Sequence, residues 1–480
     1  MQQKDSFAKA SKAAGHAFHW GGSEMETVKK RRPMGFYVCS LGFTFERCAF
    51  YTMKYLLAIW IATTAAAGGL GLSSAEGAAI SANFVAFTYV TPILGGYIAD
   101  YWLSPRVCVP LGMILMGAGY LCAWQASDLT MLWFMIILVA LGTGFFKGNL
   151  AGITGLLFHG QDELDSAFSI QYSFVNVGSF TGTALIAILA TTGIGGLKLT
   201  FQQVFLLCAL FLFIDAIWFL IGGRSLGDAG KKPFKHDQRE FIDRAKREKA
   251  QSQKLTAADY KKIAAIMMVT VFSIVFWALW YLCYMPAYFR FGWGEGADFL
   301  NRANWMIGSF QVPTSWFDSL NALTCIILGP VLAVLWSKLA KRSSGDISMY
   351  KKTGLGMILI GAAYLVMVGA DMIADRSAAG QSPLIMLVFV CVLMSVGEMV
   401  FSPLGNSFIS KLAPAKVMGI LLGFWPIAVF FANQIYPPLY KLLQMQNFKV
   451  GYGALAAIVI FFGLILWMMS KPLEKMERSV

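Results

Sequence analysis

Apolar segments of twenty or more residues recur along almost the whole of this 480-residue chain. A helix rises about 1.5 Å per residue, so about 20 apolar residues cross the hydrocarbon core of a bilayer. The composition, 57% hydrophobic and 14% charged, excludes an ordinary soluble globular protein. The sequence therefore predicts an all-α membrane protein with twelve transmembrane helices. The predicted spans are residues 34–63, 75–102, 105–126, 130–158, 163–190, 200–222, 259–290, 313–337, 352–374, 383–411, 415–440 and 449–471.

The basic residues are distributed unevenly about these spans. The net charge is +13, and of the 39 Lys and Arg residues 30 fall on one side of the membrane, 6 on the other and 3 within the spans. Cytoplasmic loops of membrane proteins carry the excess of Lys and Arg. We therefore expect both termini to be cytoplasmic, in the inner (plasma) membrane of a bacterial-type cell. The positive charge is expected to face the lipid surface rather than nucleic acid.

One long polar segment separates the first six spans from the last six. Two six-helix bundles related by an axis along the membrane normal are typical of the major facilitator fold, which we expect here. The predicted regions are a basic cytoplasmic tail (1–33), an amino-terminal bundle (34–222), a charged cytoplasmic linker (223–258), a carboxy-terminal bundle (259–471) and a cytoplasmic tail (472–480).

Charged residues lie within the first span, where a bilayer should exclude them. Glu46 and Arg47 lie near its middle, and Lys54 lies two turns further on. A charge at the bilayer centre costs at least about 2.5–3.5 kcal/mol. Helical spacing places Arg47, Tyr51 and Lys54 on one face, together with Phe43. Either this face lines a polar cavity, which we favour, or Glu46 and Arg47 form a structural pair while Lys54 extends toward the outer headgroups.

Other spans carry isolated polar residues. Lys147 in the fourth span lies between glycines that allow a helix or a ligand to approach closely. Tyr172 and Asn176 in the fifth span form a polar patch that serves either a site or helix packing. Glu398 in the tenth span lies deep in an apolar run, ahead of a helix break that begins at Ser402. Such an acid either binds a proton or an ammonium group, or pairs permanently with a cation of the other half.

Three further groups of polar residues lie near the ends of spans. Asp318 and Asn321 lie one turn apart at the start of the eighth span. Asp215 lies near the cytoplasmic end of the sixth span, which favours a structural role. Asp100 and Arg106 follow two glycines at the end of the second span and predict a gating pair, the alternative being a plain turn with a helix cap.

The charges of the two halves have opposite signs. The cations Arg47, Lys54 and Lys147 belong to the amino-terminal half, whereas Glu398 and Asp318 belong to the carboxy-terminal half. A site between the halves would have one positive and one negative wall. A short peptide carries a separated carboxylate and ammonium group, so it fits such a site.

Several stretches match a known family. The most specific are PTSWFDSLNALTCIILGPVLAVLW in the eighth span and GEMVFSPLGNSFISKLAPAK in the tenth. GTGFFKGN, FSIQYSFVNVGS and GGYIADYWL support them. Over most of its length the chain resembles the proton-coupled oligopeptide transporters of the major facilitator superfamily. The resemblance implies an alternating-access symporter that imports small peptides.

The resemblance also implies a peptide site made by both halves. The cations that meet the peptide carboxylate are Arg47 and Lys147, with Lys54 where the family usually has an arginine. The group that receives the peptide amine is Asn176, Asn321 and Glu398. The other residues that we expect to line the site are Tyr51, Tyr172, Trp277, Tyr281, Ser402 and Trp425.

Some positions depart from the family pattern. The first-span signature Glu-x-x-Glu-Arg has Phe43 in place of its first glutamate, the acid tied to proton coupling. Tyr281 stands where many relatives have a glutamate, and Asp318 stands where glutamine is usual. We therefore expect Glu46, Glu398 or Asp318 to carry the coupling proton.

These patterns predict a transporter rather than an enzyme. The eight cysteines lie in apolar segments without metal-ligand spacing, and the four histidines lie outside the spans. We therefore expect no metal site and no cofactor besides the coupling proton. The predicted protein is a monomer in the lipid bilayer that imports di- or tripeptides or peptide-like compounds. The alternatives are a transporter of a non-peptide organic anion, drug or modified amino acid with altered or absent proton coupling, and a receptor or scaffold with a frozen cavity.

Overall fold

The computed structural model describes residues 32–158, 161–234, 255–340, 347–401, 405–414 and 417–478. Residues 34–480 form one unit, to which all the elements below belong. Most of the predicted tail, residues 235–254 of the predicted linker, and Ser402 lie outside the described residues.

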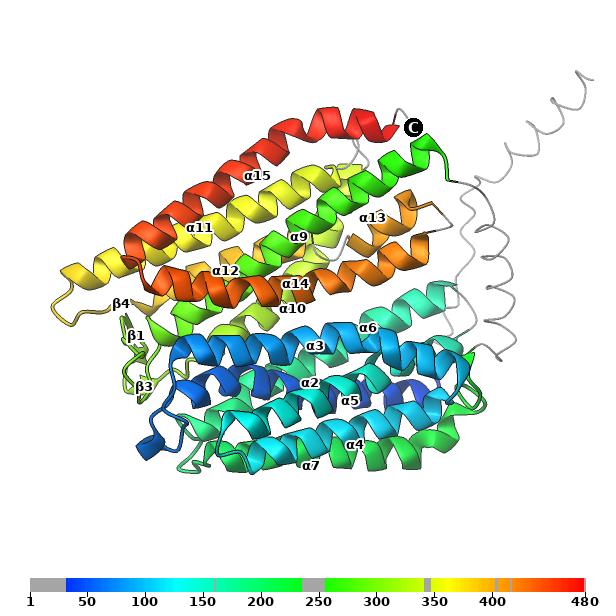
Figure 1. The fold of residues 1–480 in the computed structure, drawn as a ribbon, viewed down its shortest axis with the longest axis horizontal. Coiled ribbons are helices and arrows are strands. Elements are labelled where there is room, and N and C mark those ends of the chain that lie inside the picture. Colours follow the sequence, from blue (N-terminus) through cyan, green and yellow to red (C-terminus); the bar gives the residue numbers. More distant parts are fainter. Residues whose placement is uncertain are drawn as a thin grey trace, which may run out of the picture. The chain divides into compact units, whose positions relative to one another are not determined.

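The amino-terminal half folds into helices that run back and forth beside one another, drawn in blue to green in Figure 1. These are α2 (Met34–Ala62), α3 (Ser74–Tyr101), α4 (Pro105–Trp124), α5 (Leu129–Leu156), α6 (Gln161–Thr181) and α7 (Phe201–Gly222). Short helical turns adjoin them: η1 (Ala65–Ala67), the π-helical η2 (Gly182–Ile186), η3 (Ala187–Ala190) and η4 (Gly223–Leu226). We call the end at which α2 begins the inner end and the end at which it finishes the outer end.

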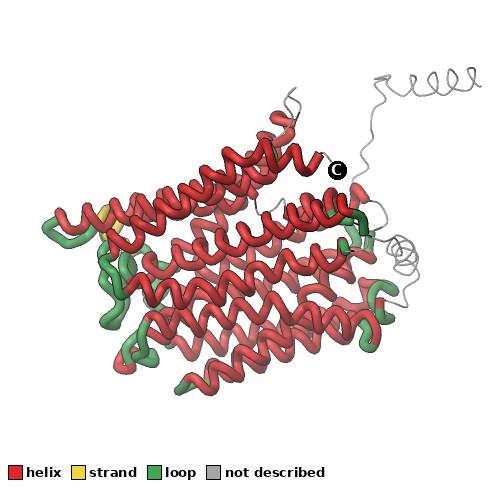
Figure 2. The backbone as a smooth tube through the Cα atoms, turned by 45° about the horizontal axis from the view of Figure 1, so that its top comes forward, coloured by secondary structure: helices red, strands yellow, loops and turns green. Residues whose placement is uncertain are grey.

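The carboxy-terminal half forms a second group of helices, from green to red in Figure 1. Its helices are α9 (Ala257–Phe289), α10 (Trp316–Ala340), α11 (Met349–Arg376), α12 (Leu384–Phe401), α13 (Gly405–Leu412), α14 (Met418–Gln444) and α15 (Phe448–Arg478). Its strands are β1 (Ala303–Asn304), β2 (Met306–Ile307), β3 (Phe310–Gln311) and β4 (Ser382–Pro383). β1 pairs in parallel with β4, and β2 pairs antiparallel with β3. Figure 2 shows the loops gathered at the ends of the helices.

The helix boundaries follow the predicted spans closely. In the predicted tenth span, 383–411, α12 and α13 lie on either side of residues 402–404, which are outside the described residues, so the helix break predicted at Ser402 stays a prediction. Within the described residues, nine helices are long and apolar enough to cross a membrane. α2 is not among them, because its charged residues lower its hydropathy. The fold is that of an all-helical, multi-pass membrane protein.

Short-range sequence signals explain where several helices begin. α3, α7 and α9 each start with a capping box, in which a hydroxyl accepts the N–H three residues on and the residue at that position bonds back to the cap. An N-cap of this kind stabilises a helix by about 0.5–2 kcal/mol. The pairs are Ser73 with Glu76, Thr200 with Gln203, and Thr256 with Asp259.

Glycines set the close approach of α3 and α5. A Cβ atom placed on Gly95 would lie 2.1 Å from the carbonyl oxygen of Gly144, which is closer than atoms can approach. A Cβ atom placed on the neighbouring Gly96 would have no other atom within 4 Å. Small residues let two membrane helices pack backbone to backbone. The glycine motifs of the second and fourth spans therefore serve helix packing.

We expect Gly95→Ala to destabilise the protein by about 1–3 kcal/mol, because the new methyl group overpacks the α3–α5 contact. Gly96→Ala is the matched control. It adds the same methyl group where there is room, and alanine favours a helix over glycine by up to about 1 kcal/mol. Thermal unfolding of the purified variants in detergent measures both effects. Equal melting temperatures for the two variants would contradict this packing argument.

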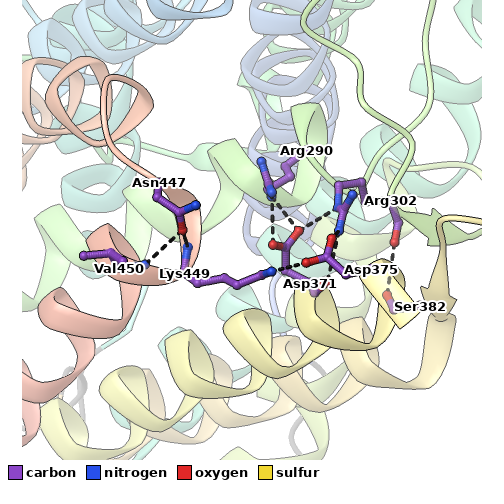
Figure 3. Close-up of polar contacts among 8 residues, drawn as sticks. All are labelled: Arg290, Arg302, Asp371, Asp375, Ser382, Asn447, Lys449 and Val450. Atoms are coloured by element: carbon purple, nitrogen blue, oxygen red, sulfur yellow. Dashed lines mark hydrogen bonds and ion pairs between the residues drawn. The ribbon is translucent and has the colours of Figure 1, made fainter. Parts of the chain in front are cut away.

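An ion-pair network fastens the outer end of the carboxy-terminal half (Figure 3). Asp371 on α11 is 1% exposed and accepts from Arg290 at 2.8 Å and from Arg302 at 2.6 Å. Asp375, one turn further along, contacts Arg302 and Lys449. The network joins the end of α9, the loop before β1, α11 and the start of α15 (Figure 3). The network therefore cross-links these four segments at the outer end of this half.

Candidate functional site

The charged residues of α2 form a buried pair within that helix. Glu46 is 1% exposed and Arg47 is 7% exposed. The guanidinium of Arg47 donates from Nε at 2.5 Å and from a terminal nitrogen at 2.6 Å to the two oxygens of Glu46. It also lies 4.6 Å from the centre of the Phe50 ring. Arg47 is thus neutralised by its own neighbour in sequence, so a ligand carboxylate would have to draw it away from Glu46.

Lys54, further along α2, reaches across to the carboxy-terminal half. Its Nζ lies 3.3 Å from Oδ1 of Asp318 at the start of α10, and both residues are buried. Tyr288 on α9 donates its hydroxyl to Oδ2 of the same carboxylate at 2.5 Å. The alternative in which Lys54 extends to the outer headgroups is therefore wrong. Instead, the pair is a buried electrostatic link between the two halves.

Aromatic rings surround the Lys54 ammonium. Its Nζ lies 4.4 Å from the ring centre of Tyr284, 5.1 Å from that of Trp280, and 5.7 Å from those of Tyr281 and Tyr51. A cation over an aromatic face gains about 0.5–2 kcal/mol, more when it is desolvated. The rings therefore provide an attraction that does not depend on the charge of Asp318.

Glu398 on α12 is held by neutral groups of the same half. The amide of Asn321 donates to its Oε2 at 3.1 Å and to the hydroxyl of Ser395 at 2.9 Å. The thiol of Cys325 lies 3.8 Å from the same oxygen. No ion pair joins Glu398 to a cation in the part of the chain that the structure describes. Among the described residues Glu398 is therefore hydrogen-bonded by neutral groups and has no ion-pair partner.

Lys147 on α5 lies against an aromatic ring. Its Nζ is 4.6 Å from the ring centre of Tyr89 on α3. Tyr51 on α2 lies beside the other two cations, with its ring centre 6.0 Å from the Arg47 guanidinium and 5.7 Å from the Lys54 ammonium. Tyr51 and Tyr89 therefore lie against the cations of the amino-terminal half.

Tyr172 and Asn176 lie one turn apart on α6. Tyr172 is 57% exposed. Asn176 donates to the carbonyl of Tyr172 at 3.0 Å. Their contribution to a binding site stays a prediction.

Of the aromatic residues predicted to line the site, Trp277 and Tyr281 lie in one group, and Trp425 lies apart from them. Trp277 on α9 lies 5.3 Å, between ring centres, from Trp280 and 6.2 Å from Tyr281, so it extends the aromatic group around Lys54. Tyr281 also stacks on Tyr436 of α14 at 5.9 Å. Trp425 on α14 is 9% exposed and belongs to the hydrophobic core.

The predicted gating residues lie at the inner end. Arg106 donates to the carbonyls of Ala229 at 2.8 Å and Gly227 at 2.6 Å. It therefore fastens the segment that follows α7 to the start of α4. A gating role for Arg106 and Asp100 stays a prediction.

Sequence reasoning missed several contributors to this site. Trp280, Tyr284 and Tyr288 surround the Lys54–Asp318 pair, and Tyr89 contacts Lys147. The three α9 residues are spaced four apart, so they share one helix face. This stripe of aromatic residues could have been read from the sequence. Its role in surrounding an ammonium group follows only from the position of Lys54 in the structure.

Hydrogen bonds between the two halves close the outer end. They join the end of α2 and the start of α3 to the loop after α9 and to α14. The donors and acceptors are Thr64 N–H to Glu295 O at 2.7 Å, Ser74 N–H to Asp298 Oδ2 at 2.5 Å, Gln444 Nε2 to Ser74 Oγ at 2.8 Å, and Tyr436 OH to Ala78 O at 3.0 Å. The structure is therefore closed at its outer end.

A cavity of about 360 Å³ adjoins this closed end. Both halves line it, with Tyr55 and Lys198 on one side and Glu295 and Thr314 on the other. Tyr55 follows Lys54 directly and its ring meets that of Tyr288 edge-on at 5.2 Å. The cavity thus lies next to the Lys54–Asp318 pair on its outer side.

Comparison with known proteins gives matches over most of the chain. A model of the POT family matches residues 107–237 and 230–444. A di-/tripeptide transporter of Lactococcus lactis subsp. cremoris is 26% identical over 487 residues, which cover 91% of this chain and 94% of the relative. The peptide transporter YePEPT of Yersinia enterocolitica is 28% identical over 442 residues, which cover 81% and 83% of the two chains.

Solved structures share the fold. The crystal structure of a peptide transporter POT in complex with sulfate superimposes with a TM-score of 0.80 at 24% identity, covering 92% of this chain and 96% of that one. A POT family transporter in complex with 5-aminolevulinic acid gives a TM-score of 0.77 at 21% identity, with 92% and 97% covered. At these identities the likeness concerns the fold alone.

Proposed function

Since this chain belongs to the POT family, we propose that it is a proton-coupled symporter that imports di- and tripeptides or peptide-like compounds by alternating access. The names of its sequence relatives, a di-/tripeptide transporter and a peptide transporter, support this substrate class. The observation that carries the coupling mechanism is the buried Lys54–Asp318 pair between the two halves.

The peptide would bind with its ends on opposite walls. Its carboxylate would take Arg47 from Glu46 and also meet Lys147, while its ammonium group would meet Glu398 and the amide of Asn321. Asn176, Tyr51 and Tyr172 would line the site, with Trp277, Tyr281, Ser402 and Trp425 as the further contributors. The contacts of Tyr51 with Arg47 and Lys54, and of Tyr89 with Lys147, support the cationic wall of this arrangement.

Protonation of Asp318 would open the outer end. When a buried ion pair loses one charge, the other charge stays buried without a partner, at a cost of about 3–5 kcal/mol. The outer-closed state would then no longer be favoured over the outer-open state. The aromatic rings would keep Lys54 in place meanwhile. The cavity beside Tyr55 would give water access from the outer side.

Return to the closed state would require the proton to move inward. Asn321 lies one turn after Asp318 and donates to Glu398, so Glu398 is the next acid along this path. A proton on Glu398 would weaken its hold on the peptide ammonium, and the ionised Asp318 would pair with Lys54 again. Glu46 would take a proton when the peptide removes Arg47 from it.

The topology and assembly of the transporter are part of the proposal. We infer twelve spans with both termini cytoplasmic, in the bacterial-type inner membrane, and a monomer as the working unit. The cation-rich linker and inner loops support this orientation. One relative with the same fold, 17% identical with a TM-score of 0.71, was solved as a tetramer, so light scattering of the detergent-solubilised protein is the measurement for assembly.

The proposal is tested in proteoliposomes with an imposed proton gradient. One charge moving through 100 mV is worth about 2.3 kcal/mol, enough for about fiftyfold accumulation. Labelled dialanine should accumulate to that order in the wild-type vesicles. No accumulation with any di- or tripeptide would rule the mechanism out.

We expect Glu398→Gln to abolish this accumulation and to lower peptide affinity by about tenfold or more, because the ammonium loses its charged partner. Calorimetric titration of the purified variant measures the affinity. N-acetylated dialanine, which lacks the ammonium group, is the control ligand and should bind both proteins equally. Equal affinity of the wild type and Glu398→Gln for free dialanine would show that Glu398 does not bind the peptide ammonium.

A transporter of organic anions, drugs or modified amino acids is the second candidate. Phe43, which packs on Phe146 with ring centres 5.4 Å apart, favours it because an apolar contact replaces the acid tied to coupling. Peptides and organic anions compared in a ligand-induced thermal-shift screen discriminate the two. Stabilisation by anions alone would favour this candidate over the peptide symporter.

A further inference from the structure

A cavity at the inner end of the amino-terminal half is lined by three cations. It has a volume of about 500 Å³ and lies where α7 ends and α4 begins. The charged residues that line it are Arg106, Arg224 and Lys231, and no acid lines it in the part of the chain that the structure describes. Proteins bind small molecules in cavities of about 300–1,000 Å³. The size and the charge of this cavity therefore suit a compact anion.

The three cations have donors available for such an anion. Arg106 donates from Nε and from one terminal nitrogen to two carbonyls of the segment after α7. A guanidinium has five N–H donors, so its other terminal nitrogen remains for a ligand. Lys231 contacts Asp228 at 2.8 Å, but these side chains are 55% and 97% exposed, and an ion pair so exposed stabilises little. Arg224 is exposed. A phosphate group, which arginine binds through two parallel hydrogen bonds and lysine through its charge, matches these donors.

The helix faces beside the cavity are apolar and exposed. α4 and α7 pack against each other (Figure 1). The exposed apolar residues of α7 are spaced so that they share one helix face, and α4 has two more, placed two turns apart. They are Leu210 (46% exposed), Ile214 (51%), Ile217 (57%) and Ile221 (72%) on α7, and Val107 (52%) and Ile114 (45%) on α4. Leu220, which is 61% exposed, lines the cavity itself. The cationic cavity therefore lies at the inner end of a surface suited to acyl chains.

We infer that this cavity binds the phosphate headgroup of an anionic phospholipid of the inner leaflet, whose acyl chains lie along the apolar faces of α4 and α7. Basic pockets on the cytoplasmic side of membrane proteins bind headgroups of this kind. The phosphate bridges Arg106 at the start of α4 to Arg224 and Lys231 on the segment after α7. It therefore adds to the two hydrogen bonds by which Arg106 holds that segment. The inference goes beyond the proposed function, because it depends on the membrane fold and not on peptide transport.

Native mass spectrometry of the full-length protein in detergent tests the inference, with phosphatidylglycerol and phosphatidylcholine of the same acyl chains as probes. We expect the wild type to bind phosphatidylglycerol in preference to phosphatidylcholine. The variant Arg224→Gln/Lys231→Gln should bind phosphatidylglycerol about tenfold or more weakly, since each basic residue near the membrane surface contributes about fivefold. Lys261→Gln/Lys471→Gln is the matched control. It removes the same charge from exposed positions at the inner ends of α9 and α15, outside the cavity, and should bind as the wild type does.

Thermal unfolding in detergent separates a lipid from a free phosphate. Phosphatidylglycerol should raise the melting temperature of the wild type and of the control more than that of the cavity variant. Inorganic phosphate should not reproduce this rise, because it has no acyl chains. Equal stabilisation by inorganic phosphate, equal binding of the two lipids by the wild type, or equal affinity of the two double variants for phosphatidylglycerol would each overturn the inference. If the cavity variant does not fold, Arg224→Gln and Lys231→Gln are measured singly, and wild-type affinity in both would likewise overturn it.

Discussion

Asp318→Asn is expected to abolish proton-driven accumulation of dialanine while leaving its exchange across the membrane nearly intact. Asparagine has the shape of the protonated acid, so it removes the charge opposite Lys54 permanently. The imposed gradient then has no acid to act on at this position. Accumulation should fall from about fiftyfold at 100 mV to about onefold. Parallel assays of gradient-driven uptake and of counterflow in proteoliposomes measure the two quantities.

The matched control is Asp318→Glu. It keeps a titratable carboxyl group near Lys54 and Tyr288, so accumulation should persist, although at a lower rate because the longer side chain disturbs the buried pair. Loss of exchange in Asp318→Asn would show a general defect of folding or binding. Full accumulation by Asp318→Asn would exclude Asp318 as the coupling acid.

The second large effect is expected at the Glu46–Arg47 pair. Arg47→Met leaves the Glu46 carboxylate buried without its cation, and breaking a buried pair in this way costs about 3–5 kcal/mol. The variant should therefore unfold at a much lower temperature in detergent, and it should bind peptides poorly because the carboxylate loses its main partner.

The double variant Glu46→Gln/Arg47→Met separates these two effects. Removing both charges together should restore most of the stability, since a buried ion pair replaced by neutral groups is often neutral or stabilising. Peptide affinity should stay low, because Arg47 is still absent. A single variant Arg47→Met that is as stable as the wild type would mean that Glu46 is not ionised in the folded protein.

Much of the fold follows from the sequence. Apolar segments set the helices, and capping residues such as Ser73 and Thr256 fix where they begin. The proline-containing motif of the tenth span predicts a helix break that begins at Ser402, a position outside the described residues. The pairing of the outer strands, such as β1 with β4, was not predicted, because two-residue strands have no pattern of their own.

The site was predicted as a set of residues but not as a set of partners. Arg47, Lys147 and Glu398 were expected to form two opposed walls, and this stays a prediction; the structure shows Arg47 paired with Glu46, and Glu398 accepting a hydrogen bond from Asn321. The sequence contains no information on which of several cations meets which acid, because that depends on how two bundles meet. Adjacent residues such as Glu46 and Arg47 also seldom face each other on a helix, so their pairing was a weak expectation.

The Lys54 surroundings explain two departures from the family pattern together. Tyr281 contributes a ring beside Lys54 where many relatives have a glutamate, and Asp318 supplies an acid where glutamine is usual. We infer that the acid opposite the cation of α2 has moved from α9 to α10. The two positions lie 37 residues apart in the sequence, so the sequence alone does not connect the two changes.

Spin-label distances across the outer end test the central claim most directly, namely that a proton on Asp318 opens this end. Genetically encoded labels at the exposed positions Leu197 and Met445 report the separation of the two halves. The account predicts that acidification lengthens this distance in the wild type and that the distance in Asp318→Asn does not depend on pH. A distance that responds to pH equally in both proteins, or in neither, would contradict it.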